Sequence, residues 1–126
     1  MKIGHFSPSS HKHIIYQLFV RLFSNTRTKN KPFGTIRENG CGKFDDINET
    51  VLLALKNFGV THIWYTGVLE HSSMNAYPDY NIPSDDPRIV KGRAGSPYAV
   101  RDYYDVDPDL ANDVGKRMEE FTAMIH

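Results

Sequence analysis

Two apolar stretches separated by a helical pattern dominate the first half of the chain. Residues 14–23 are almost continuously apolar, with β-branched and aromatic side chains and no helical stripe, which predicts a strand buried on both faces. Residues 46–58 carry apolar side chains at helical spacing and stop before Gly59, which predicts a helix terminated by a left-handed glycine. Residues 61–66 predict a second strand. Together these elements predict a βαβ unit with a parallel strand pair.

The second half of the chain has a different pattern. Residues 68–108 contain prolines at positions 78, 83, 87, 97 and 108 and show no sustained period, which predicts a long loop of functional importance or an element that the pattern hides. Residues 112–125 again place apolar side chains at helical spacing and predict a second helix. The expected fold class is therefore α/β, with two parallel strands and two helices. Trp64 and Tyr65, in the second strand, are expected in the core.

The length and the charge balance limit the classes of protein to consider. A chain of 126 residues is enough for one compact domain, which we assign to residues 13–126 after a loose polar arm at 1–12. Fifteen Lys and Arg balance fifteen Asp and Glu, so the sequence carries no electrostatic signature of nucleic-acid binding or of an anionic membrane surface. We expect neither kind of partner.

The cysteine content and the first residues bear on location. Cys41 is the single cysteine, so no internal disulfide can form and a reducing compartment is expected. Residues 1–10 lack a basic region followed by an apolar one, and no apolar run approaches the ~20 residues of a membrane span. We expect a cytoplasmic protein, with a periplasmic or secreted location left open. His5 and His11, just before His13, could bind a metal, but histidines in a loose arm usually bind nothing specific.

The stretch Gly95–Pro108 has the most distinctive chemistry. It combines turn-forming residues with three tyrosines and three aspartates: Tyr98, Tyr103, Tyr104, Asp102, Asp105 and Asp107. Aromatic rings can cover the apolar face of a flat, hydroxyl-rich ligand while carboxylates accept hydrogen bonds from its rim. The alternative is a tight turn whose tyrosines cover a core edge. Asp105 and Asp107 could also be an acid–base pair, although a turn role is the more common one for such aspartates.

Three stretches, taken in order, carry a family resemblance. Residues 15–23 read Ile-Tyr-Gln-Leu-Phe-Val-Arg-Leu-Phe, residues 55–66 end in Trp-Tyr-Thr, and residues 102–108 read Asp-Tyr-Tyr-Asp-Val-Asp-Pro. They resemble the opening strand, the second strand and the Asp-Tyr-Tyr block of the α-amylase superfamily, glycoside hydrolase family thirteen. The resemblance implies that residues 13–126 are the first two βα units of a (β/α)8 TIM barrel whose site lies at the carboxyl ends of its strands.

The resemblance also implies a function. The parent protein would be a retaining glycoside hydrolase acting on α-glucans or related α-glucosides. Its catalytic carboxylates would follow the fourth and fifth strands, which are not among these 126 residues. We therefore expect no catalytic residue, no metal ligand and no cofactor in this chain, and no hydrolase activity from it alone, while the resemblance allows calcium in the complete protein.

Two residues match substrate-binding positions of that family. Tyr98 matches the tyrosine that stacks under the sugar next to the scissile bond, and Asp102 matches the aspartate that steadies the loop. Ser96-Pro97 replaces the usual His-Gly before the tyrosine, and Ala99 replaces an Asp or Trp after it. These replacements remove a sugar hydrogen-bond donor and a polar clamp, so the first sugar subsite is expected to differ.

A rival hypothesis belongs to another class. The chain could be a non-catalytic module that binds carbohydrate through Gly95–Pro108, or that associates with itself or a partner through open sheet edges. A nucleotide-binding α/β domain is disfavoured, because no glycine fingerprint follows the first strand.

Overall fold

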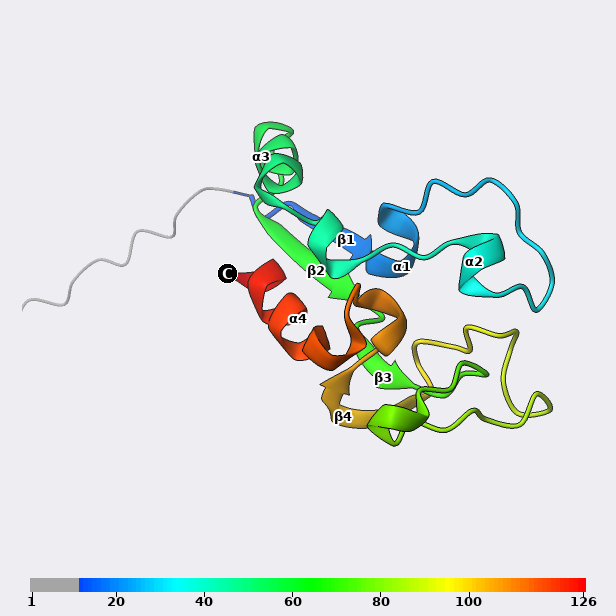
Figure 1. Ribbon diagram of the computed structural model, residues 1–126. Helices are drawn as coiled ribbons and strands as arrows, with labels where there is room; N and C mark the ends of the chain where they lie inside the picture. Colours follow the sequence, from blue (N-terminus) through cyan, green and yellow to red (C-terminus); the bar gives the residue numbers. More distant parts are fainter. Residues whose placement is uncertain (1–11) are drawn as a thin grey trace, which may run out of the picture.

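The computed structural model describes residues 12–126, and the sheet and helix arrangement is shown in Figure 1. The predicted arm with His5 and His11 lies outside the described residues, apart from Lys12. The strands and helices, in chain order, are β1 (Ile15–Phe19), α1 (Val20–Phe23), α2 (Ile36–Asn39), α3 (Glu49–Asn57), β2 (His62–Thr66), β3 (Leu69–His71), β4 (Val100–Val106) and α4 (Arg117–Ile125). Short 3-10 turns lie at η1 (Phe44–Asp46), η2 (Pro78–Tyr80), η3 (Pro108–Leu110) and η4 (Val114–Lys116).

The predicted parallel pair is confirmed. Strand β1 pairs with β2 in parallel, from Ile15 opposite His62 to Phe19 opposite Thr66, and α3 lies in the connection between them. The side chain of Asn48 caps α3 by accepting a 3.3 Å hydrogen bond from the Val51 N–H. Gly59 follows the helix with φ +103°, in the region that favours glycine. The fold is therefore mixed α/β, as the pattern predicts.

The first strand is shorter and less buried than predicted. Residues 20–23 turn into the short helix α1, so only Ile15–Phe19 are extended. Ile15 is 64 % exposed and Trp64 is 58 % exposed, whereas Leu18 is buried and Tyr65 packs against the core. Because successive side chains of a strand point to opposite faces, a two-stranded sheet with one covered face leaves alternate residues in solvent. The prediction that Trp64 lies in the core is wrong.

An antiparallel pair, β3 with β4, was not predicted. It joins Leu69 to Val106, Glu70 to Asp102 and His71 to Val100, with irregular register between the pairs. This sheet does not fit a chain built only from two parallel βα units, and it occupies part of the segment predicted as a long loop. The pattern hides it because β3 is three residues long and β4 is mostly polar, so neither shows alternating hydrophobicity.

The second predicted helix is present but starts later. It begins at Arg117 rather than near residue 112, after the 3-10 turn η4. The Asp113 side chain accepts a 2.9 Å hydrogen bond from the Gly115 N–H and so caps that turn. Within residues 12–126, no helix is long and apolar enough to cross a membrane.

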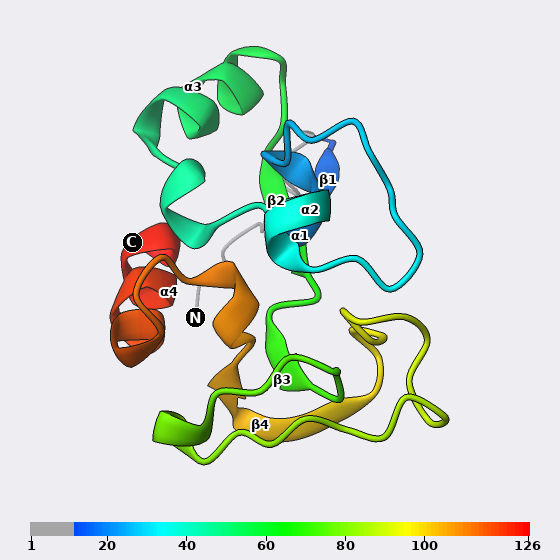
Figure 2. The same ribbon diagram turned by 45° about the vertical axis from the view of Figure 1, so that its right-hand side comes forward.

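One hydrophobic core receives side chains from both sheets and from α4, whose arrangement is visible from a second direction in Figure 2. Phe44 is fully buried and meets the ring of Phe121 edge-on, with centroids 5.7 Å apart. The buried members are Leu18, Val20, Phe44, Ile47, Val106, Leu110, Ala111 and Met124. Because β1 and β4 share this core, the end of β1 and the end of β4 are brought together.

Candidate functional site

The turn that carries Tyr98 is attached to strand β3. The Ser72 N–H donates a 3.0 Å hydrogen bond to the Ala99 carbonyl, and Nε2 of the buried His71 lies 2.9 Å from the Ala94 carbonyl oxygen. Within the turn, the Ala99 N–H donates to the Ser96 carbonyl at 2.9 Å. These bonds hold the backbone on both sides of Tyr98, so β3 and the residue after it place the turn that carries this tyrosine.

Tyr98 itself lies beside the carboxyl ends of the parallel strands. Gly67 directly follows β2 with φ +71°, and a Cβ added there would lie 2.5 Å from the Phe19 ring and 3.0 Å from Cβ of Pro97. Pro97 therefore packs where β1 and β2 end. The next residue, Tyr98, is 80 % exposed. The sequence-predicted tyrosine thus presents its ring to solvent at the end of the parallel sheet.

Asp102 lies in strand β4 rather than in a loop. Its carboxylate accepts a 2.7 Å hydrogen bond from the Tyr104 N–H. A hydrogen bond of this kind is what a role in steadying the local backbone requires. Tyr103 and Tyr104 are 73 % and 94 % exposed, so they do not cover a core edge. The stretch from Gly95 is accordingly a turn followed by a strand with exposed tyrosines.

The structure gives Asp105 and Asp107 different partners. Asp105 accepts hydrogen bonds of 2.8 and 2.6 Å from the Arg117 guanidinium. Burial alone would raise the pKa of Asp105, but the hydrogen bonds from Arg117 and from the Val106 N–H, together with the Arg117 charge, outweigh burial and lower that pKa. Asp107 instead accepts a 3.0 Å hydrogen bond from the Asp109 N–H and so caps η3. Neither arrangement is that of an acid–base pair.

Beneath the turn lies a buried ionic cluster centred on Asp109, which is 1 % exposed. The Arg21 guanidinium, from α1, bonds to Asp109 and lies 3.2 Å from Oδ2 of Asp107. The Tyr77 hydroxyl donates to Oδ1 of Asp109 at 2.6 Å, and the Asn75 amide donates to Oδ2 at 2.8 Å. The cluster therefore joins the end of β1 to the end of β4.

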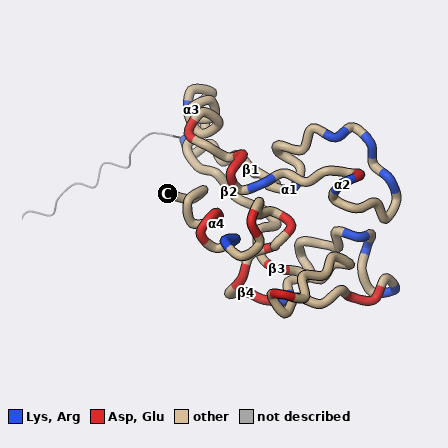
Figure 3. Tube along the Cα trace, viewed as in Figure 1, with Lys and Arg blue, Asp and Glu red and all other residues tan. Residues whose placement is uncertain are grey.

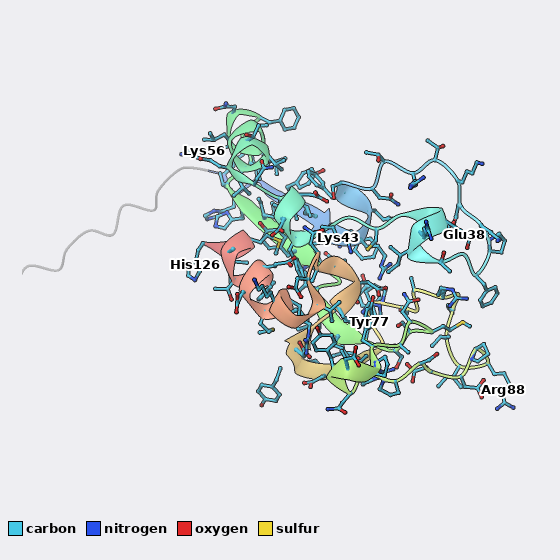
Figure 4. The ribbon with its side chains drawn as sticks, viewed as in Figure 1. Glu38, Lys43, Lys56, Tyr77, Arg88 and His126 are labelled. Atoms are coloured by element: carbon cyan, nitrogen blue, oxygen red, sulfur yellow. The ribbon has the colours of Figure 1, made fainter. Side chains whose placement is uncertain are left out.

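The backbone around Asp109 is held as well. Lys43, labelled with Tyr77 near the middle of Figure 4, donates from Nζ to the Asp109 and Ala111 carbonyls at 2.6 and 2.9 Å. Cys41 lies against the same carbonyl, with Sγ 3.4 Å from the Asp109 oxygen. Burial raises the pKa of Cys41 to about 11, so its thiol stays protonated at neutral pH.

The Arg21 guanidinium faces two carboxylates, those of Asp107 and Asp109, within the cluster. Burial alone would lower the pKa of Arg21, but the charges of Asp109 and Asp107 outweigh it and raise that pKa. Burial and the Asp109 charge raise the pKa of Tyr77, so its hydroxyl remains a donor at neutral pH. Across residues 12–126, no buried side-chain nitrogen or oxygen is left without a hydrogen bond. A buried carboxylate whose oxygens are engaged in hydrogen bonds is not free to attack a substrate, so the cluster holds the ends of β1 and β4 together rather than performing chemistry.

The sequence interpretation missed this cluster as a unit. Arg21 and Asp107 each fall in a motif that carries the resemblance, yet nothing in their spacing shows that they meet. Asn75 and Tyr77 come from the segment without a periodic pattern, and Asp109 directly follows that segment. Only the tertiary arrangement brings them together.

Comparison with known proteins adds no assignment. Neither a protein-family model, nor a curated protein, nor a solved structure matches this chain. In the part of the chain that is described, no group of three or more His, Cys, Asp or Glu side chains is placed to hold a metal ion.

The placement of Tyr98 depends on Gly95, and a substitution there should show it. Gly95 has φ +70°, and an added Cβ would lie 1.8 Å from the Ser72 carbonyl oxygen, so Gly95→Ala must displace backbone. We expect a loss of about 2–3 kcal/mol in unfolding free energy, measured in urea. Gly92→Ala is the matched control, since Gly92 also has positive φ but an added Cβ meets nothing within 4 Å. The control should cost only about 1–2 kcal/mol, and equal losses would contradict the role given to the Ser72 contact.

Proposed function

We propose that this chain is an amino-terminal part of an α-amylase-like glycoside hydrolase acting on α-glucans or related α-glucosides. In this proposal Tyr98 stacks beneath a glucose unit, and the barrel is completed by strands outside these 126 residues. The observation that carries the proposal is an exposed tyrosine on a fixed turn at the carboxyl ends of two parallel strands. Barrel enzymes build their sites at that end.

The chemistry of the surroundings supports binding without cleavage. Retaining glycosidases need two free carboxyl groups about 5–5.5 Å apart. Near the turn, Asp105 is paired with Arg117, and Asp107 and Asp109 are buried with Arg21. We therefore propose that the chain holds one face of the sugar and that other segments supply the nucleophile and the acid.

A second candidate function has its own supporting observation. Tyr103 and Tyr104 are exposed on β4, and each sheet has only two strands, so each keeps open edges. This arrangement suits a non-catalytic module that binds carbohydrate, or associates through an edge, without completing a barrel. The first function depends on Tyr98, whereas the second depends on the tyrosines of β4.

A titration of the chain with maltotriose and maltoheptaose, followed by amide NMR shifts, separates them. We expect Tyr98→Ala to weaken binding about tenfold, since the lost stacking is worth roughly 1.5 kcal/mol. Tyr98→Phe, which keeps the ring, should stay within about twofold of the unchanged chain. Tyr104→Ala removes an even more exposed tyrosine and serves as the control.

Two results would count against the proposed function. A loss of binding in Tyr104→Ala but not in Tyr98→Ala would favour the binding module on β4. Release of reducing sugar from maltoheptaose by the pure 126-residue chain would contradict the placement of the catalytic groups in other segments.

A further inference from the structure

A cavity of about 500 Å³ opens beside α2, between residues 24–35 and residues 91–94. In Figure 1 these segments are the cyan loop and the yellow loop on the right. The cavity is lined by six cationic side chains, and no Asp or Glu among residues 12–126 lines it. Those cations are Arg21, Arg27, Lys29, Lys31, Lys91 and Arg93. In a chain with balanced charge, this is a local excess of one sign.

Three of the six cations are already engaged. Arg21 belongs to the buried cluster with Asp109, and Nζ of Lys31 pairs with Glu38 at 2.5 Å. Glu38, labelled on α2 in Figure 4, has its pKa lowered to about 2 by hydrogen bonds from Lys31 and Thr35. Nε of Arg93 donates to the Phe33 carbonyl at 3.0 Å.

The other three have neither an ion pair nor a side-chain hydrogen bond across the cavity within residues 12–126. Arg27, Lys29 and Lys91 make no ion pair with any residue from 12 to 126. Figure 3 shows several basic positions along these two loops, in addition to others on α3 and at the start of α4. Like charges that share one cavity repel each other, and a bound anion would remove that repulsion.

The loop that carries these charges is held in one shape although it has no strand of its own. The Asn25 amide donates to the Asn39 carbonyl at 2.9 Å. The Asn39 side chain accepts a 2.8 Å hydrogen bond from the Lys31 N–H and donates one of 2.9 Å to the Lys31 carbonyl. The Arg93 bond to Phe33 ties the two walls together. A fixed polar loop of this kind loses little entropy on binding a ligand.

An aromatic side chain completes the lining. Phe33 lines the cavity, is 54 % exposed and has φ +56°, a conformation that is unusual for a bulky residue. An exposed ring beside cations and side-chain amides suits a ligand with a flat apolar face, hydroxyl groups and a concentrated negative charge. A phosphorylated sugar has all three properties.

We propose that this cavity binds the phosphate monoester of a phosphorylated sugar, with Lys29, Lys91 and Arg27 holding the phosphate. The lining ends at Ala94, four residues before Tyr98, and four residues span at most about 14 Å. One oligosaccharide can therefore reach both places. The sugar part of this inference rests on the proposed function, whereas the phosphate part rests on the cavity alone, and the ligand class becomes a phosphorylated α-glucoside.

The test uses isothermal titration of the 126-residue chain with inorganic phosphate, glucose 6-phosphate and glucose at constant ionic strength. We expect glucose 6-phosphate to bind at least about fivefold more tightly than phosphate, because the ring adds contacts to the sugar. The double variant Lys29→Gln, Lys91→Gln should lose about tenfold or more in affinity for both anions. The charge-matched control is the double variant Lys56→Gln, Lys116→Gln, which removes two exposed lysines outside the cavity and should bind like the unchanged chain.

Each outcome separates the parts of the inference. Equal affinity for phosphate and glucose 6-phosphate overturns the sugar part and keeps a phosphate site. Absence of anion binding, or equal weakening in the double control Lys56→Gln, Lys116→Gln, overturns the site itself. Melting temperatures in chloride buffer should agree among the variants, which shows that the surface changes leave the fold intact. If the unchanged chain does not bind maltotriose, the proposed function is rejected, and the conclusion about the phosphate site is unaffected.

Discussion

Replacing Asp109 with alanine is expected to destabilise the protein by about 3–5 kcal/mol, because the change leaves a buried cation without its main partner. The Arg21 side chain is only 13 % exposed, and its one remaining ion-pair partner would be Asp107, at 3.2 Å. The hydroxyl of Tyr77 and the amide of Asn75 would also lose their acceptor. Urea unfolding followed by circular dichroism measures the loss.

A second Arg–Asp pair in the same chain provides the control. Asp86 bonds to Arg88 in the same chemical way, but the Arg88 side chain is 87 % exposed. Asp86→Ala should therefore lower the unfolding free energy far less than Asp109→Ala does, because solvent screens an exposed pair. If the two alanine variants lost similar amounts, burial would not be what makes the Asp109 cluster important.

Coupling within the cluster can be measured directly. Arg21→Met removes the charge while keeping most of the side-chain volume, and Asp109→Asn keeps the shape of its partner. Since each single change takes the main charged partner from a buried group, the double variant should lose less stability than the two single losses added together. Strict additivity would mean that Arg21 and Asp109 act independently.

The parallel pair could be predicted because its signal is local. Residues 61–66 and the helix before them have the period and the glycine stop of their elements, and the structure places β2 and α3 there. What the pattern overestimated was burial. It treats an apolar run as a strand covered on both faces, whereas a sheet of two strands leaves Trp64 in solvent.

The antiparallel pair could not be predicted, for a related reason. Strand β4 is stabilised by specific contacts rather than by an apolar face. Arg101 bonds from β4 to Glu70 on β3 at 3.0 Å and also to Asp85 in the following loop. Such contacts join residues far apart in the sequence, and no window of the sequence contains both partners.

Of the candidate sites, the tyrosine turn could be predicted from the sequence and the basic cavity could not. Tyr98 was identified from its chemistry and from a motif, and its exposure on a fixed turn agrees with a binding role. The basic cavity was missed because Lys29 and Lys91 lie on separate loops of a chain with zero net charge. Summed charge reports nothing about where charges gather, so a balanced composition excluded an extended basic face but not a local pocket.

Replacing Phe44 with alanine should cost about 3–5 kcal/mol, as large as the loss at Asp109 but through a cavity rather than a charge. Phe44 has no exposed surface and packs edge-on against Phe121 of α4. Because that contact holds α4 against η1, amide hydrogen exchange in α4 should accelerate more than exchange in β1 and β2. Phe58→Ala removes the same side chain at a position that is 85 % exposed, and should change stability by less than about 0.5 kcal/mol. Uniform acceleration across the molecule would show instead that α4 unfolds only together with the sheets.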